Sequence, residues 1–305
     1  MEKPLSPAQM KEKPMENEAP SRDVLEIISK RATCRSFRAD PIPDAVMERL
    51  LEAACSSASS GGFQRISIVV VRDAAKKKRL AQLSREQGFI AKAPASFVFC
   101  VDHRRMRRIA EYEASPCDTG DSVVSLCMGF ADATIAAQSM ALAAQAQGLR
   151  SCYNGNVLDM PGEMTQLLEL PSGVVPAIML TVGYPVSPNG RLSRKYSPRV
   201  MVHEEVYRDM PIEALHAEHG KKFPETYRLS DERRGRLFRA AKAQGGEAFA
   251  RRCLVRADTA ERLTAYQFWF GCYYYDENRE GADAGEYLDY LAGQGFDITG
   301  RRENS

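Results

Sequence analysis

Apolar residues gather in three continuous runs that predict buried strands. The runs are I-S-I-V-V-V-R at 66–72, S-F-V-F-C-V at 96–101 and V-P-A-I-M-L-T-V-G-Y-P at 175–185. Continuous β-branched and aromatic runs of this length are typical of strands that are covered on both faces. A fourth segment, S-C-Y-N-G-N at 151–156, predicts a short strand or a turn.

Between these runs the apolar residues follow helical spacing. Residues 43–54, 76–87 and 161–170 predict helices, and 123–147 predicts the longest one. This long segment is rich in alanine and apolar on nearly all sides, so we expect it in a large core or in a subunit interface. A short helix after residue 21 should turn four apolar side chains inward: Val24, Leu25, Ile27 and Ile28. The alternation of helices with buried strands indicates an α/β or α+β fold built around a sheet.

The two ends of the chain follow different patterns. Residues 1–20 hold prolines and charges and few apolar side chains, so we expect a disordered N-terminal tail before a domain spanning 21–210. After about residue 210 the strand patterns vanish, which predicts a helical C-terminal extension at 211–305. Its helices are expected at 212–219, 231–244, 258–275 and 283–293, the third of them capped by Asp258 and Glu261.

Composition narrows the classes of function. Forty-two Lys and Arg against forty Asp and Glu leave a formal net charge of +2, whereas a nucleic-acid binder would show a strong basic excess. We see no run of about 18 apolar residues and no apolar signal core, so we expect a cytoplasmic protein without membrane or nucleic-acid partners. The eight cysteines include no C-x-x-C pair, which predicts reduced thiols and no metal site.

The segment R-A-T-C-R-S-F at 31–37 carries the first candidate chemistry. In an extended chain, alternation places Arg31, Thr33 and Arg35 on one face. Two guanidinium groups beside a hydroxyl suit an anion such as phosphate, because arginine binds phosphate through two parallel hydrogen bonds. A solvated basic loop explains this segment, taken alone, equally well.

Three further segments carry small or polar residues next to predicted elements. In S-A-S-S-G-G-F-Q at 57–64, small residues permit a ligand to approach closely and Ser59 and Gln64 offer hydrogen bonds, although a flexible loop is the simpler interpretation. G-L-R-S-C-Y-N-G at 148–155 follows the long helix. V-G-Y-P at 182–185 ends the last strand and precedes basic residues.

Taken in order, these four segments resemble the nitroreductase family of FMN-dependent oxidoreductases. The family's R-x-S-x-R-x-F is matched by Arg31, Thr33, Arg35 and Phe37, and its A-P-S-x-x-N-x-Q-P-W loop is matched in part by Ser59 and Gln64. Its alanine-rich helix running into G-L-G-S-C-W is echoed by A-A-Q-A-Q-G-L-R-S-C-Y, and its final strand also ends in V-G-Y-P. The resemblance covers about residues 21–210.

This resemblance implies a fold, a cofactor and a reaction. The implied fold is an α+β sandwich with a mainly antiparallel central sheet flanked by helices, assembled as a homodimer in which both subunits build each FMN site. The implied reaction is hydride transfer from NADH or NADPH to N5 of FMN, and then to an electron-poor small molecule such as a nitroaromatic or a quinone. No catalytic side chain is implied, because the cofactor carries the chemistry.

The resemblance also implies roles for individual residues. It places Arg31 and Thr33 at the FMN phosphate and ribityl chain, with Arg194 or Lys195 closing on the phosphate. It places Arg35 beside N1 and O2 of the flavin ring, where a fixed cation stabilises the reduced state. The remaining implied contacts come from the backbone of Asn154 and Gly155 at N5, and from Ser59 and Gln64 against the ring or the ribityl chain.

Departures from the family pattern leave other functions open. Gly62 stands where the family has an asparagine, and Arg65 and Ile66 stand where it has P-W. Two alternatives therefore remain. One is a flavin-destroying or reductive dehalogenating enzyme on the same fold, and the other is an FMN-binding module without catalysis.

Two other segments each have a functional and a structural interpretation. H-R-R-M-R-R at 103–108 would attract a phosphorylated nicotinamide donor or an acidic partner, but a solvated helix face balanced by Glu111 and Glu113 is the commoner origin of such a run. Y-Q-F-W-F-G-C-Y-Y-Y at 266–275 would line a flavin pocket or a dimer surface, whereas aromatic residues at helical spacing more often pack in a core.

Overall fold

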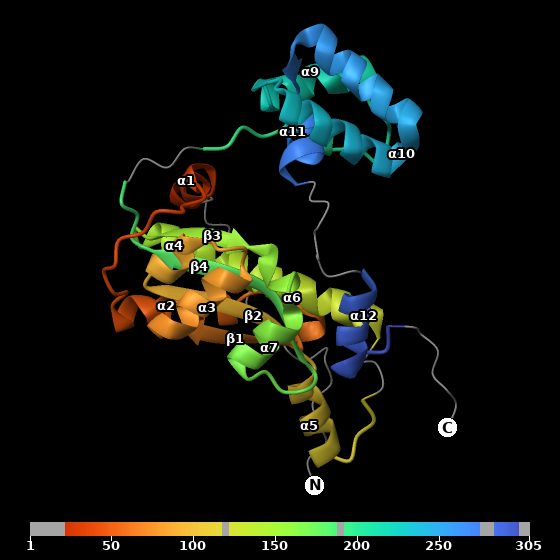
Figure 1. The fold of residues 1–305 in the computed structure, drawn as a ribbon. Helices are drawn as coiled ribbons and strands as arrows, with labels where there is room; N and C mark the ends of the chain where they lie inside the picture. The colour runs from red at the N-terminus through yellow and green to blue at the C-terminus, as the bar shows by residue number, and fades with distance from the viewer. Residues whose placement is uncertain (1–21, 118–121, 188–191, 275–283, 299–305) are drawn as a thin grey trace, which may run out of the picture.

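A computed structural model describes residues 22–117, 122–187, 192–274 and 284–298. The tail expected at 1–20 lies outside the described residues. Figure 1 shows a domain built around a sheet, and a second, helical unit standing apart from it.

A four-stranded antiparallel sheet forms the centre of the first domain. Its strands are β1 (Ile66–Val71), β2 (Ala95–Asp102), β3 (Arg150–Asn154) and β4 (Val174–Gly183), in the spatial order β1-β2-β4-β3. All three pairings are antiparallel, and every position of the inner strand β2 is buried. The four strand predictions are confirmed, and so is the α+β fold with an antiparallel sheet.

Helices cover both faces of this sheet. On one face lie α2 (Asp44–Cys55) and α6 (Val123–Ala146), and on the other lie α3 (Ala74–Leu83), α4 (Gly88–Lys92) and α7 (Pro161–Leu168). Alternate side chains of β2 therefore enter different cores: Phe97 and Phe99 pack on the α6 side, and Val98 packs on the other. The remaining short elements of the domain are α1 (Arg22–Lys30), η2 (Ser60–Gly62), α5 (Arg104–Tyr112), η3 (Gly155–Leu158) and α8 (Pro198–Met201).

Helix α6 has one buried face and one exposed apolar face. Gly129 lets the buried face approach β2, since a Cβ at this position would lie 2.5 Å from Cγ1 of Val101. The opposite face exposes Val124, Met128 and Ile135, with Val124 67% exposed. By length and composition alone α6 is apolar enough to cross a membrane, so the expectation that no such segment exists is wrong. Of its most apolar window, 44% is buried inside the protein.

Helix α1 also exposes its apolar side chains in the single chain. Val24, Leu25 and Ile28 are about half exposed or more, and Leu25 reaches 62%. The expectation that these residues point into the core of the same chain is therefore wrong. Together with the outer face of α6, they leave apolar surface that nothing within the described residues covers.

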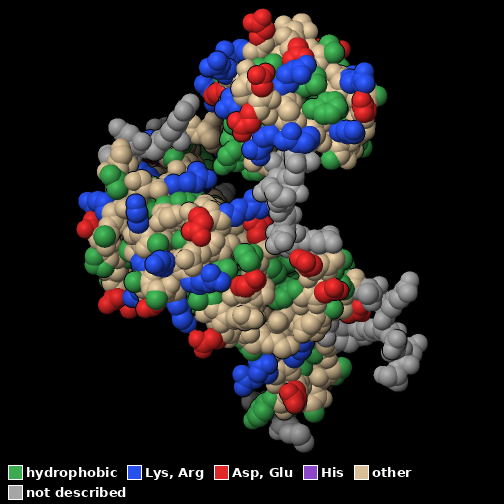
Figure 2. Space-filling model, in the orientation of Figure 1, with side chains coloured by type: hydrophobic (Ala, Val, Ile, Leu, Met, Phe, Trp, Pro, Cys, Tyr) green, Lys and Arg blue, Asp and Glu red, His purple; other side chains and the backbone are tan. Residues whose placement is uncertain are grey.

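The helical unit comprises α9 (Ile212–Lys222), α10 (Asp231–Ala260), α11 (Ala265–Phe268) and η4 (Trp269–Tyr273), with a two-stranded ribbon of β5 (Tyr227–Arg228) and β6 (Arg262–Leu263). Leu237, Ala257, Leu263 and Cys272 form its core. In the aromatic run, Phe268 packs on this core and stacks on Tyr227 with ring centroids 3.9 Å apart, but Tyr266, Phe270, Tyr273 and Tyr274 remain largely exposed. Acidic and basic side chains alternate over the visible surface of the unit (Figure 2).

The helix expected to begin at Asp258 does not begin there. Helix α10 continues to Ala260 through a kink at Gly245 and Gly246, and Asp258 lies in its last turn, where it forms an ion pair with Arg234 at 2.8 Å. The next helix is capped by Thr264 instead.

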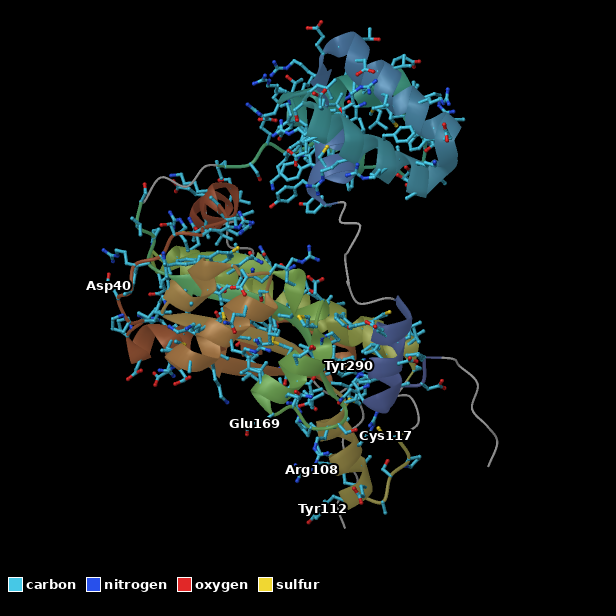
Figure 3. All side chains as sticks on the ribbon, viewed as in Figure 1. Asp40, Arg108, Tyr112, Cys117, Glu169 and Tyr290 are labelled. Atoms are coloured by element: carbon cyan, nitrogen blue, oxygen red, sulfur yellow. The ribbon has the colours of Figure 1, made fainter. Side chains whose placement is uncertain are left out.

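Helix α12 (Ala284–Gly293) packs on the sheet domain rather than on the helical unit. Leu291 and Phe296 belong to the core on the α6 side, and the hydroxyls of Tyr290 and Thr165 lie 2.7 Å apart. Figure 3 shows Tyr290 on α12 at this contact. Residues 211–305 therefore contribute to two separate cores in the structure.

Candidate functional site

Residues 31–38 run along the edge of the sheet beside β3. Thr33 forms a parallel bridge with Ser151, which holds this segment extended against the strand. Ala32 and Phe37 are buried, whereas Thr33, Arg35 and Ser36 are exposed, so the burial alternates only over the first part of the segment.

The loop that follows β4 holds the second half of this segment. The amide of Val186 donates to the carbonyl of Ser36 at 3.0 Å, and the amide of Arg38 donates to the carbonyl of Tyr184 at 2.8 Å. A cavity of about 200 Å³ opens between the segment at 32–36 and the loop that follows β4. It is lined by residues 32–36, Arg150 and residues 185–187.

Arg31 brings a partly buried cation to the same edge. Its guanidinium carbon lies 5.8 Å from the ring centroid of Tyr153, and its Nη1 is buried without a hydrogen-bond partner among the described residues. Leaving such a donor unsatisfied costs about 1–3 kcal/mol, so the position favours an anionic ligand that accepts a hydrogen bond. Burial raises the pKa of the Tyr153 hydroxyl to about 12, and the Arg31 cation opposes this shift.

The guanidinium of Arg35 interacts with the thiol of Cys152. Burial raises the pKa of Cys152, and the nearby Arg35 cation partly offsets that effect. Arg31 acts on the same thiol in the same direction. Two arginines therefore make the electrostatic potential positive along this edge, and Thr33 lies between them. We call Arg31, Thr33 and Arg35 the anion cradle.

Asn154 and Gly155 form the turn at the end of β3. The buried side chain of Asn154 donates to Oε1 of Gln87 at 3.3 Å and accepts from the hydroxyl of Thr181 at 3.4 Å, which fixes the turn. No heavy atom lies within 4 Å of the position that a Cβ of Gly155 would take. The space beside this backbone is therefore open to a ligand.

Ser59 and Gln64 lie at the opposite edge of the sheet. Their loop leads into β1, and β2 and β4 separate β1 from β3, so about 14 Å of sheet lies between the two edges. The loop is ordered by its own side chains: Oγ of Ser59 accepts from the amide of Gln64 at 3.2 Å, and Nε2 of Gln64 donates to the carbonyl of Cys55 at 2.8 Å. Within one chain, these two residues do not join the anion cradle.

Asp132 also positions this loop, and the sequence analysis missed it. Its Oδ1 accepts from the amide of Ser60 at 2.8 Å, and its buried Oδ2 has no partner among the described residues. The available signal was the presence of a single charged residue in the alanine-rich helix α6.

Arg150 was missed as well. It lines the cavity beside Thr33 and Arg35, and its Nη1 donates to the carbonyl of Leu149 at 3.0 Å. Arg150 stands where the family motif G-L-G-S-C-W has its second glycine. A third arginine at the cradle could have been recognised from that departure.

The basic pair after β4 faces other partners in the structure. Nη1 of Arg194 forms an ion pair with Oε1 of Glu225 at 2.6 Å, and Lys195 is exposed beside it. Neither side chain lines the cavity at Thr33. In the part of the chain that the structure describes, no group of three or more His, Cys, Asp or Glu side chains is placed to hold a metal ion.

Comparison with known proteins gives a consistent result. The model described as "Nitroreductase family" matches residues 28–184. The Cr(VI) reductase of Pseudomonas sp. (strain G-1) is 30% identical over 192 residues, which cover 63% of this chain and 78% of that protein. The oxygen-insensitive NADPH nitroreductase of Salmonella typhimurium is 30% identical over 203 residues, which cover 67% of this chain and 82% of that protein.

Solved structures resemble this one over similar or longer ranges. The NADPH:FMN oxidoreductase of Vibrio harveyi, solved with NAD+, has a TM-score of 0.60 at 27% identity and covers 65% of this chain and 84% of its own. NfrA2 of B. megaterium has a TM-score of 0.67 at 24% identity and covers 90% of this chain and 98% of its own, a likeness that concerns the fold alone.

Proposed function

This chain belongs to the nitroreductase family, and from that premise we propose that it is an FMN-dependent oxidoreductase that takes electrons from NADH or NADPH and passes them to an electron-poor small molecule. Bound FMN supplies the hydride-transfer chemistry. The acceptor class that we propose is nitroaromatic or quinone compounds. The cytoplasm, where nicotinamide donors are available, is the location that we expect.

The observation that carries this proposal is the buried, unpaired Nη1 of Arg31 beside Thr33 and Arg35. A phosphate ester fits this cradle because guanidinium groups donate paired hydrogen bonds to its oxygens. Arg31 and Thr33 bind the phosphate and ribityl chain, and Arg150 adds a second cation, beside Arg35, to the cavity that Thr33 lines.

The other residues orient the flavin ring. Arg35 holds positive charge near the pyrimidine edge, where the reduced cofactor carries negative charge, so it favours the reduced state. The backbone of Gly155, held in place by the buried side chain of Asn154, faces open space and orients the edge that exchanges hydride.

We further propose a homodimer in which the loop carrying Ser59 and Gln64 completes the site of the partner subunit. Two observations support it. The loop and the cradle lie at opposite edges of one sheet, and α1 and α6 expose apolar side chains that a second copy would cover. In this arrangement Arg194 approaches the phosphate only if its ion pair with Glu225 opens, whereas the exposed Lys195 is not held by that pair.

The experiment is the absorption spectrum of the purified protein, followed by NAD(P)H oxidation with a nitroaromatic or a quinone added. We expect a yellow protein that releases FMN on denaturation and turns over with the acceptor. Bound FMN without turnover would support a non-catalytic module, and loss of the flavin or release of halide from a halogenated substrate would support the alternative enzymes. A colourless protein that binds no FMN would refute all three.

A further inference from the structure

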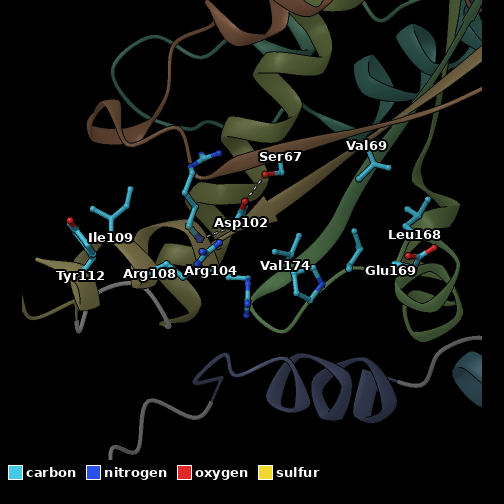
Figure 4. Close-up of a pocket in the computed structure, with 13 residues that line it drawn as sticks. Ser67, Val69, Asp102, Arg104, Arg108, Ile109, Tyr112, Leu168, Glu169 and Val174 are labelled. Atoms are coloured by element: carbon cyan, nitrogen blue, oxygen red, sulfur yellow. Dashed lines mark hydrogen bonds between the residues drawn. The ribbon is translucent and has the colours of Figure 1, made fainter.

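A second, larger cavity lies far from the anion cradle. Its volume is about 740 Å³, and it opens between α5, β1 and the connection from α7 to β4 (Figure 4). Val174, the first residue of β4, lines this cavity, whereas the cradle adjoins the loop after Gly183 at the end of the same strand. Ten residues of extended chain separate the two sites by about 30 Å.

One wall of the cavity is cationic. Arg104, Arg105 and Arg108 of α5 line it, and Figure 4 shows Arg104 and Arg108 on the same side as Tyr112. Arg105 is engaged, because its Nη2 donates to the carbonyls of Gln64 and Ile66. The guanidinium groups of Arg104 and Arg108 have neither an ion pair nor a hydrogen bond with any described residue.

The two acidic residues of the cavity are engaged in other interactions. Oδ2 of Asp102 accepts from the hydroxyl of Ser67, and Oδ1 accepts from the amide of Arg105 at 2.9 Å. Glu169 forms an ion pair with Lys76 at 3.3 Å. Two guanidinium charges, one helical turn apart, are therefore left without a counter-ion in the cavity.

The rest of the lining is apolar and held in place. Val69, Leu168, Leu170 and Val174 form the floor, and the ring of Tyr112 stands at the rim with 92% of its surface exposed. The carbonyl of Gly173 accepts from the amides of His103 and Arg104 at 3.0 and 3.3 Å, which anchors the start of α5 to β4. The cavity is larger than a phosphate group needs and lies in the range of sites for small organic ligands.

We propose that this cavity binds a nucleotide, with a phosphate monoester between Arg104 and Arg108 and the base against Tyr112 and the neighbouring Ile109. A dianionic monoester matches two unpaired guanidinium groups better than a monoanionic carboxylate does. An aromatic base matches an exposed tyrosine ring beside aliphatic side chains. This assignment gives the basic run at 103–108 a function that the flavin site does not use.

Two sources of this chemistry are the 2′-phosphate end of NADPH and a free mononucleotide. Only the first source rests on the proposed oxidoreductase function. Binding of a mononucleotide can be measured without turnover. A failure of the nucleotide site can therefore be distinguished from a failure of the proposed oxidoreductase function.

The test is calorimetric titration of the FMN-saturated, full-length protein with 2′-AMP, 5′-AMP and adenosine. At least one of the two nucleotides, 2′-AMP or 5′-AMP, should bind the double variant Arg104→Ala/Arg108→Ala at least tenfold more weakly than the wild type. Adenosine should bind the wild type much more weakly than that nucleotide does. The double variant Lys78→Ala/Arg79→Ala removes the same charge from α3 and should bind like the wild type. Saturation with FMN keeps the anion cradle occupied during the titration, which excludes the cradle as the site of the two nucleotides.

The steady-state constants then identify the source. A rise in KM for NADPH but not for NADH in the Arg104→Ala/Arg108→Ala variant assigns the site to the donor, and unchanged KM values for both assign it to a free nucleotide. The proposal is overturned if neither phosphate binds the wild type, if adenosine binds as tightly as both phosphates, or if the two double variants lose affinity equally.

Discussion

Arg31 is the residue whose surroundings most constrain the ligand of the flavin site. Its Nη1 is buried near Tyr153 and has no acceptor among the residues that the structure describes, while its neighbour Lys30 is exposed and paired with Glu26. The two cations are adjacent in sequence, but only Arg31 has a buried donor that can bind an anion away from water. This difference provides a matched pair of variants.

We expect Arg31→Ala to weaken FMN binding by at least tenfold, because it removes a charge-assisted contact worth about 1.5–3 kcal/mol. Lys30→Ala removes the same formal charge and should change the Kd of FMN less than twofold. Titration of each apo-protein, followed by flavin fluorescence, provides the measurement. Equal losses in the two variants would mean that general charge, and not the cradle, attracts FMN.

Cys100 links stability to alkaline pH. Burial, with a contribution from Asp102, raises the pKa of this thiol to about 12, whereas an unfolded cysteine titrates near 8.5. The folded state therefore holds the proton more tightly, and the free energy of unfolding should fall as the pH rises above about 8.5, by at most about 1.4 kcal/mol per unit from this group.

Replacing the Cys100 thiol should make the free energy of unfolding depend less on pH in the alkaline range. Urea unfolding between pH 8 and 9.5, below the range of tyrosine ionisation, should show a shallower loss for Cys100→Ala than for the wild type, whatever the packing cost of the substitution. Cys55→Ala changes an exposed thiol and should keep the wild-type slope. Identical slopes in all three proteins would contradict this account.

At the level of elements, helix ends were the hardest feature to predict. Asp258 and Glu261 have the residue types of a cap, but α10 continues past Asp258, which lies in its last turn and pairs with Arg234. The functional cap is Thr264, whose hydroxyl accepts from the amide of Gln267 at 3.2 Å while the Gln267 side chain accepts from the amide of Thr264 at 3.1 Å. Two nearby segments carry similar capping residues, and the sequence alone does not distinguish the one that forms the cap.

Thr264→Ala should destabilise the helical unit by about 0.5–2 kcal/mol, because the amide of Gln267 at the start of α11 loses its acceptor. Thr259→Ala, in the exposed last turns of α10, removes only a hydroxyl that bonds the carbonyl of Val255 and should change stability by a few tenths of a kcal/mol. Hydrogen exchange of residues 212–274 resolves this unit from the sheet domain. Equal protection in the two variants would show that the capping box contributes nothing.

Strands and long helices, by contrast, followed from the sequence. A continuous apolar run such as 96–101 is stable as a strand only where both faces of the sheet are covered, and the structure buries every residue of β2. The extended conformation of the segment that carries Arg31, Thr33 and Arg35 was also predictable, and the bridge between Thr33 and Ser151 confirms it, whereas anion binding by these residues stays a prediction. Contacts between residues far apart in the sequence were not predictable. Nothing in the sequence indicates that Arg194 pairs with Glu225, or that Asp132 accepts from the amide of Ser60.

On the scale of the whole molecule, the exposed apolar faces of α1 and α6 require an explanation. Leu25 and Val124 are each more than half exposed, and the alanine-rich helix α6 presents Met128 and Ile135 on the same side as Val124. The proposed dimer would cover this surface and would bring the loop at 57–64 of one copy to the cradle of the other.

The double variant Val124→Glu/Met128→Glu should therefore convert a dimer into a monomer, because it places two charges in an apolar interface. Val255→Glu changes an equally exposed residue of the helical unit and should remain dimeric. Light scattering during size-exclusion chromatography distinguishes the masses. A monomeric wild type, or a double variant that still dimerises, would contradict the shared site.

The central claim is that this chain accepts electrons from a nicotinamide donor on bound FMN and passes them on. Its most direct test is an anaerobic titration of the FMN-bound protein with NADPH and then NADH, followed by addition of a nitroaromatic or quinone acceptor. We predict that the flavin absorbance near its visible maximum is lost in proportion to the donor and returns when the acceptor is added. A flavin absorbance that neither donor changes would contradict the account.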